Sequence, residues 1–186
     1  MKIRLLITVT IWATCSLQAS TPPANFIIEL MAKSCLASKT RFKGIITQGD
    51  KYYLLSLNKG TDLTVNQPSP ISTSLKLGIL DELMNCSSKN RLLEYLRTLH
   101  VDTNIVSLGF FANEPVYIIG ARALNNAAAQ LWINKSSLLP VKEHSGEQEI
   151  LFEKWQLLAD QKSKFPHLIT KTISQMPTVL SIAEVD

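Results

Sequence analysis

The chain has 186 residues, of which 46% are hydrophobic and 18% are charged, and its formal net charge is +4. This length suits one domain with a substantial core, and the apolar content excludes an intrinsically disordered chain. Two of the positive charges, Lys2 and Arg4, lie in the first few residues, and without them 17 basic residues face 15 acidic ones. A balance so close to neutral argues against a nucleic-acid partner, which needs a clustered basic face.

The N-terminus has the pattern of an export signal. A basic start, MKIR, is followed by the apolar run LLITVTIWATCSL and then by Leu17-Gln18-Ala19 before Ser20. This arrangement, with a small residue at the last position, is typical of a cleaved signal peptide. We therefore expect a signal peptide over 1–19, a single mature domain over 20–186, and export to the periplasm. An uncleaved membrane anchor and a buried N-terminal strand are the alternatives.

Export would leave two cysteines, Cys35 and Cys86, in the mature chain. An oxidising compartment allows them to form a disulfide. That bond would close a long loop and stabilise the fold by roughly 4 kcal/mol on the loop-entropy model. Two separate buried thiols are the alternative, because free cysteine behaves as a small hydrophobe. The chain has no Cys-x-x-Cys pair, so neither thiol redox catalysis nor a zinc ribbon is indicated.

The mature chain begins with a helix that is followed by strands. In PANFIIELMAKSCLAS, over 23–38, apolar residues such as Ile27, Leu30 and Met31 recur at helical spacing and predict a one-sided helix. Strands are then expected over 42–46, 52–57 and 61–65, separated by turn signals at Gly49-Asp50 and Asn58-Lys59-Gly60.

A helical pair interrupts the strands. Two prolines in QPSPISTS break the strand pattern, and the segments LKLGILDELMN and SSKNRLLEYLRTL then carry aliphatic residues at helical intervals. Ser87-Ser88 supplies a cap between the two helices. We therefore expect two short helices inserted between two groups of strands.

From Thr103 the apolar period changes to two. The expected strands cover 104–111, 116–120, 130–133, 138–144, 149–158, 167–174 and 179–185. Successive strands joined by short turns indicate an antiparallel meander, and a meander this long must curl. The predicted fold class is α+β: a curved antiparallel sheet, or open half-barrel, covered by the N-terminal helix and the inserted helical pair.

Three short motifs in the second half of the chain carry a family resemblance. They are Trp132-Ile133-Asn134-Lys135, Pro140-Val141-Lys142 and Phe165-Pro166-His167-Leu168-Ile169. The region 101–170 resembles the periplasmic outer-membrane lipoprotein-sorting-protein-like family, the LolA/LolB-like superfamily, whose corresponding motifs are of the types W-I-D-K, P-x-K/R and F-P-x-x-I. Asn134 stands where the family usually has Asp. The buried arginine that regulates lid closure in the lipoprotein carriers has no match, since the context of Arg41 differs.

The resemblance implies a fold that binds apolar ligands in the cell envelope. We therefore expect an exported carrier or binding protein that holds a lipid, a lipoprotein acyl chain or another apolar ligand in the concave face of the sheet. The candidate ligand-binding residues are Phe110, Tyr117, Trp132, Phe152 and Trp155 from the strands, with Ile27, Leu30, Leu80 and Leu83 from the helices.

Two other functions stay open. The same fold could bind envelope proteins or act as a sensor with no transported ligand; a filled concave face would favour this alternative, whereas an open apolar cavity would favour the carrier. An enzyme is the third hypothesis, but no G-x-S-x-G, H-E-x-x-H, P-loop or G-x-G-x-x-G motif occurs. His100, His144 and His167 lack metal-ligand spacing. We therefore expect no catalytic residues, no metal site and no cofactor.

Overall fold

The computed structural model describes residues 21–34, 42–49, 51–58, 62–65, 76–122, 125, 127–157 and 164–185. The expected signal peptide over 1–19 lies outside the described residues. Within the part of the chain that is described, no helix combines the length and apolarity needed to cross a bilayer.

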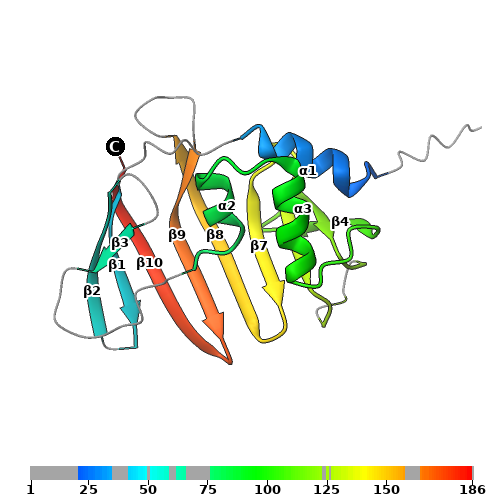
Figure 1. Cartoon of the computed structure of the whole chain (residues 1–186). Coiled ribbons are helices and arrows are strands. Elements are labelled where there is room, and N and C mark those ends of the chain that lie inside the picture. Colours follow the sequence, from blue (N-terminus) through cyan, green and yellow to red (C-terminus); the bar gives the residue numbers. More distant parts are fainter. Residues whose placement is uncertain are drawn as a thin grey trace, which may run out of the picture.

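The described strands form one ten-stranded antiparallel sheet (Figure 1). The spatial order of its strands is β3-β2-β1-β10-β9-β8-β7-β6-β5-β4. The first strand, β1, pairs with the last strand, β10, and this pairing joins the two groups of strands into one sheet. The strands are β1 (Phe42–Gln48), β2 (Lys51–Asn58), β3 (Asp62–Val65), β4 (Val106–Phe111), β5 (Glu114–Ile119), β6 (Gln130–Asn134), β7 (Pro140–Ser145), β8 (Gln148–Leu157), β9 (Lys164–Ile173) and β10 (Met176–Val185). Because β3 and β4 remain as edges, the sheet is an open half-barrel, which confirms the predicted fold class.

Three helices lie over one face of this sheet (Figure 1). They are α1 (Ala24–Ala32), α2 (Ile79–Met84) and α3 (Lys89–Thr98). The side chain of Ser88 caps α3 by accepting a hydrogen bond from the backbone N–H of Arg91, as the sequence predicts. We call these three helices the helical cover, and the face of the sheet beneath them the concave face.

Some strands begin earlier than the sequence predicts, because the turns are shorter than expected and two prolines that the sequence places outside strands lie within them. Ser174 and Gln175 form a two-residue turn with positive φ angles, so β10 begins at Met176 instead of at 179. Pro166 and Pro177 lie inside strands, where a proline usually signals a turn. The sequence predicts the existence of each strand correctly, although proline led to misplaced ends.

A single apolar core fills the space between the helical cover and the concave face. Each of the three helices contributes apolar side chains that are at most 1% exposed, such as Ile27, Leu80 and Leu96. They pack in one cluster with strand residues such as Tyr117 and Phe152. The concave face beneath the cover is therefore occupied by the protein's own side chains.

The opposite face of the sheet carries a second, smaller apolar cluster around Trp132. This cluster contains Val116, Ile118 and Val141 and is separate from the main core. The indole N–H of Trp132 donates to the side-chain oxygen of Gln130 at 2.9 Å, and the ammonium of Lys142 lies 5.3 Å from the ring centroid. The prediction that Trp132 lines the concave face is therefore wrong, because strand alternation turns it to the other side of β6.

The hairpin between β6 and β7 depends on Asn134. Its side-chain oxygen accepts hydrogen bonds from the backbone N–H groups of Ser136 and Ser137 and from the Ser137 hydroxyl, at 2.9 to 3.1 Å. Its side-chain amide donates to the carboxylate of Glu114 in the neighbouring strand. An aspartate could accept the first three hydrogen bonds but could not donate the last one, so the asparagine joins this turn to β5.

Replacing Asn134 should therefore destabilise the fold. We expect Asn134→Ala to lower the free energy of unfolding by about 1–3 kcal/mol, because two turn N–H groups lose their acceptor. Urea denaturation would measure the change. Ser136→Ala, which alters an exposed side chain in the same turn, is the matched control and should stay within about 0.5 kcal/mol of the wild type. Equal midpoints for the two variants would contradict the prediction.

Candidate functional site: a buried carboxylate and a polar cavity beneath the helical cover

The most unusual residue of the concave face is Glu143 in β7. Its pairing partners in the adjacent strands are Leu131 and Ile150, which both belong to the apolar core. Strand alternation turns Glu143 to the same side, where it is 0% exposed. An ionisable group so completely buried needs hydrogen-bond partners, and both of its oxygens have one.

The Glu143 carboxylate binds α2 and α3 at the same time. One oxygen accepts the backbone N–H of Ile79 at 2.7 Å, and the other accepts the Tyr95 hydroxyl at 2.9 Å. The Ile79 N–H belongs to the first turn of α2, where a helix has no internal acceptor to offer. One strand side chain therefore attaches both inserted helices to the sheet.

Gly78 makes this contact possible. Its φ of +69° lies in the left-handed region, which glycine adopts without a steric penalty. A Cβ atom at this position would lie 2.7 and 2.8 Å from the two Glu143 oxygens and 2.8 Å from the side chain of Ile150. The backbone before α2 can therefore approach the carboxylate only because residue 78 has no side chain.

Burial dominates the electrostatics of this contact. Desolvation raises the pKa of Glu143 to about 7, against the smaller opposing effects of its hydrogen bonds to Ile79 and Tyr95. Among the charged neighbours, Asp81 raises this pKa further and Lys171 lowers it. Desolvation, followed by the nearby Glu143 charge, also raises the pKa of the Tyr95 hydroxyl, so Tyr95 remains a hydrogen-bond donor.

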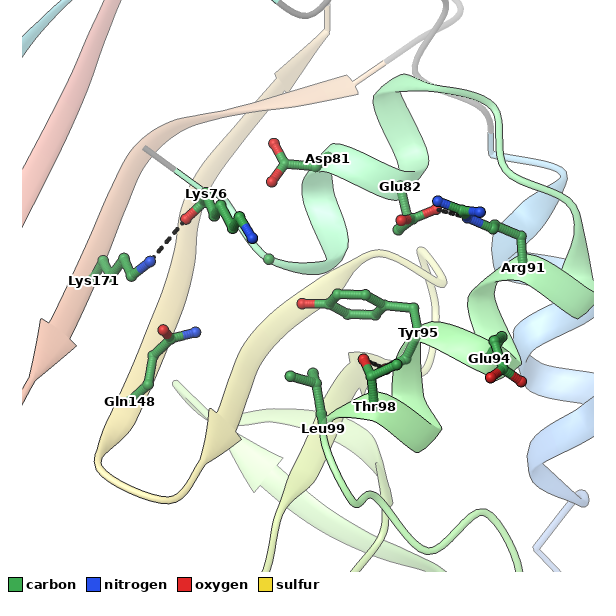
Figure 2. Close-up of a pocket in the computed structure, with 11 residues that line it drawn as sticks. Lys76, Asp81, Glu82, Arg91, Glu94, Tyr95, Thr98, Leu99, Gln148 and Lys171 are labelled. Carbon is green, nitrogen blue, oxygen red and sulfur yellow. Dashed lines mark hydrogen bonds and ion pairs between the residues drawn. The ribbon is translucent and has the colours of Figure 1, made fainter. Parts of the chain in front are cut away.

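A cavity of about 610 Å³ adjoins this contact (Figure 2). Its wall comes from the segment before α2, from α2 and α3, and from strands β8 and β9. Most of the residues that line it are of polar or charged types, although much of the surface they present is the apolar part of their side chains: Lys76, Gly78, Asp81, Glu82, Arg91, Glu94, Tyr95, Thr98, Leu99, Gln148 and Lys171. Its volume falls in the range of about 300–1,000 Å³ that is common for small-molecule sites.

Most of the predicted ligand-binding residues lie beneath the helical cover. Tyr117 and Phe152 from the sheet and Ile27, Leu80 and Leu83 from the helices are buried in the same core cluster. None of these five lines the polar cavity.

The remaining predicted residues lie less deeply. Leu30 is half-buried on α1, and Trp155 packs against the core with a buried indole N–H that has no hydrogen-bond partner. Phe110 is 75% exposed near the end of edge strand β4; it lies on the same side of the strand as Val106 but outside the packed core.

The sequence interpretation missed Glu143, Tyr95, Asp81 and Lys171. A signal for Glu143 was present, because the run from Pro140 to His144 places an acidic residue on the inward-facing register of a strand. Asp81 and Lys171 carry no such signal, since only the tertiary packing brings them to the wall of one cavity.

Cys86, just after α2, is disulfide-bonded. Cys35 lies outside the described residues, so the bond between Cys35 and Cys86 stays a prediction.

The titration of Glu143 should make stability depend on pH. The folded pKa of about 7 exceeds the ordinary 4.5, so the folded chain keeps a proton that the unfolded chain releases. The contribution of Glu143 to stability should therefore be fully present below pH 4.5 and be lost as the pH rises to 7, by at most about 1.4 kcal/mol per pH unit for this one group. Asp81 acts in the same direction, but only up to about pH 6.

Glu143→Gln should remove the decline between pH 6 and 7. Glutamine can accept the Ile79 N–H and donate to the Tyr95 oxygen, so the helices stay attached without a titrating group. Urea denaturation at a series of pH values would test this. A variant that keeps the slope of the wild type across that interval would show that another group causes it.

Gly78→Ala should be among the most damaging single-methyl substitutions in this chain. We expect a loss of about 3 kcal/mol or more, from backbone strain together with overlap with the Glu143 carboxylate. Gly146→Ala is the matched control, because Gly146 also has a positive φ but nothing within 4 Å of the added Cβ. It should lose only about 1–2 kcal/mol. Similar losses in thermal or urea denaturation would argue against a close approach at Gly78.

The sequence matches no protein-family model and no curated protein. Solved structures do resemble the fold. An outer-membrane lipoprotein-sorting protein domain from Vibrio parahaemolyticus aligns with a TM-score of 0.52 and 10% identity, over 87% of this chain and 91% of that domain. A DUF1329 family protein from Desulfovibrio piger gives 0.50 and 10% identity, over 89% and 93%. A LolA superfamily protein from Nitrosomonas europaea gives 0.45 and 15%, over 89% and 94%.

At such low identity a structural likeness concerns the fold and leaves the activity open. The likeness to the Vibrio domain extends over nearly the whole of both chains. The resemblance noted in the sequence is thus confirmed at the level of architecture: this chain has the open, helix-covered antiparallel sheet of a lipoprotein-sorting protein domain.

Proposed function

We propose that this protein is an exported periplasmic binding protein or carrier, and that it takes an apolar ligand, such as a lipid or a lipoprotein acyl chain, beneath its helical cover. The structure then corresponds to the closed, ligand-free form. The observation that carries the proposal is the nature of the contact between the cover and the sheet. That contact is mostly apolar, and its one fully buried polar side chain among the residues that the structure describes is that of Glu143.

The apolar part of this contact is replaceable. Burial of apolar surface contributes roughly 25 cal/mol per Å² and has no directional requirement. An acyl chain lying against Tyr117 and Phe152 would bury the same surface that Ile27, Leu80 and Leu83 bury now. Replacing the helix side chains by a ligand would keep this apolar surface of the sheet out of water. The free-energy cost of moving the cover would therefore be much smaller than if the surface became exposed to water.

The polar part of the contact is small and local. Besides the two hydrogen bonds of Glu143, the Ser145 hydroxyl donates to the carbonyl of Leu99 just after α3, at 3.2 Å. The Lys171 ammonium donates to the carbonyl of Lys76 before α2, at 3.0 Å. With few directional contacts between cover and sheet among the described residues, the cover can move as a unit, as a lid requires.

A protein-interaction module is the second candidate, and two observations favour it. The concave face is filled, which is the condition stated above for this alternative. In addition, edge strand β4 exposes Leu108 by 46% and Phe110 by 75%. An apolar strand edge is a common docking point for an extended segment of another protein.

Weakening the contact of the cover should increase ligand binding if the protein is a carrier. Tyr95→Phe removes one hydrogen bond to Glu143 while it keeps the aromatic ring, at a cost of about 1–3 kcal/mol. We expect this variant to bind a fluorescent fatty acid roughly fivefold or more tightly than the wild type, because less free energy is spent on opening the cover. Titration of the probe fluorescence would give both affinities.

Asn134→Ala is the control for general loss of stability, since it weakens a hairpin on the sheet and leaves the hydrogen bonds of the cover intact. It should bind the probe like the wild type. Equal gains in both variants would indicate nonspecific binding to loosened protein. Failure of both the wild type and Tyr95→Phe to bind the probe would refute the carrier and leave the interaction module.

A further inference from the structure

The polar cavity contains an acid and a base that have no ion-pair partner among the described residues. Asp81 projects from α2 and Lys171 from β9, and both line the cavity (Figure 2). One carboxylate oxygen of Asp81 accepts the backbone N–H of Leu77 at 2.8 Å. Lys171 donates to a backbone carbonyl, that of Lys76. Each side chain thus has a backbone partner, and its charge is not neutralised by direct contact.

The other acidic groups around the cavity are already compensated. The Glu82 carboxylate lies 3.4 Å from the Arg91 guanidinium. The Glu94 carboxylate lies 3.1 Å from the Arg97 guanidinium. One oxygen of Glu143 accepts a hydrogen bond from the Ile79 N–H and the other accepts one from the Tyr95 hydroxyl. The side chain of Lys76 is exposed to solvent. The charged groups that face the cavity without an ion-pair partner among the described residues are therefore one anion, Asp81, and two cations, the partly buried Lys171 and the exposed Lys76. At longer range the Glu143 and Asp81 carboxylates favour the charged form of Lys171, and Lys76 opposes it.

The charges of Asp81 and Lys171 are held partly out of water. Desolvation is the largest influence on each group: it raises the pKa of Asp81 to about 6 and lowers the pKa of Lys171. Two opposite charges that are partly desolvated in one cavity, without contact between them, would both gain from a molecule that brings a counter-charge to each.

We propose that this cavity binds a zwitterionic group, whose ammonium pairs with the carboxylate of Asp81 and whose anionic part pairs with the ammonium of Lys171. The Tyr95 hydroxyl and the Gln148 amide, which also line the cavity, supply further polar surface for such a group. A simple cation would leave the positive charge of Lys171 without a counter-charge. A simple anion would leave the negative charge of Asp81 without one. On the proposed carrier function, on which this identification rests, the zwitterion is the polar head of the amphiphile whose chain lies beneath the cover.

O-phosphoethanolamine is the probe that tests this site, because it carries an ammonium and a phosphate and has no acyl chain. Isothermal titration calorimetry on the full protein at pH about 7.5, where Asp81 is ionised, should show saturable binding in a one-to-one ratio. Ethanolamine alone and inorganic phosphate alone should each bind roughly tenfold more weakly or worse. Binding should also weaken as the pH falls below about 6, because Asp81 loses its charge there and the phosphate of the probe gains a proton in the same range. The Asp81→Asn variant described below should show only the part of this decline that comes from the phosphate.

Two variants remove the charges one at a time. Asp81→Asn keeps an oxygen for the Leu77 N–H, and Lys171→Met keeps the length of the side chain, so both should fold, which circular dichroism would verify. Each should weaken phosphoethanolamine binding roughly tenfold or more. Asp102→Asn and Lys135→Met are the matched controls, since both residues are exposed and do not line the cavity. They should bind like the wild type.

The outcomes separate this site from the carrier function. Absence of saturable binding, or equally tight binding of ethanolamine or phosphate alone, would overturn the zwitterion site even if the fluorescent fatty acid binds. Phosphoethanolamine binding without fatty-acid binding would support the site and identify a small soluble zwitterion as its ligand. If a lysophosphatidylethanolamine binds more tightly than both phosphoethanolamine and the fluorescent fatty acid, the result would support the site and identify the zwitterion as the head group of a lipid.

Discussion

The arrangement of this protein depends on the burial of one carboxylate, that of Glu143, in an otherwise apolar layer. A charge in such a place is costly unless both of its oxygens accept hydrogen bonds, and the two available donors come from different helices. The strand can therefore bury its glutamate only when α2 and α3 both lie on the sheet. Gly78 completes the arrangement, since any side chain there would overlap with the carboxylate.

This contact explains why helices that are too short to be stable alone have fixed positions. α2 has six residues and α3 has ten, and isolated helices of such length are marginal in water. Their apolar sides supply most of the attraction to the sheet, but apolar burial sets neither register nor orientation. Two directional hydrogen bonds to one fixed acceptor supply both. The same economy of polar contacts makes the cover separable from the sheet, which is the basis of the proposed lid.

The structure places two kinds of surface next to each other beneath the cover. Toward Tyr117 and Phe152 the space is apolar and filled. Toward Asp81 and Lys171 it is polar and open, and Glu143 and Tyr95 stand at the boundary between the two regions. An amphiphilic molecule has the same division between a chain and a head. The proposed cargo and the proposed zwitterion site are thus two aspects of one arrangement, although each has its own test.

The sequence by itself determined the fold class and the elements. The change of apolar period from 3.6 to two at Thr103, together with the turn signals, predicted the helices, the strands and the antiparallel pairing of successive strands, because these depend on local spacing and short connections. It did not predict the pairing of β1 with β10, which joins the two groups of strands. Period-two alternation could also have turned Glu143 inward. What it could not decide was which of the two apolar faces the helices cover, so Trp132 was assigned to the wrong side.

Only the tertiary structure decided the site. Asp81, Tyr95 and Lys171 belong to three elements that are far apart in the chain, and no local pattern relates them. Whether the concave face is open or filled is equally nonlocal, since it depends on how closely three separate helices approach the sheet. Local sequence fixes which side chains an element presents, whereas the distances between elements follow from the packing of the whole chain.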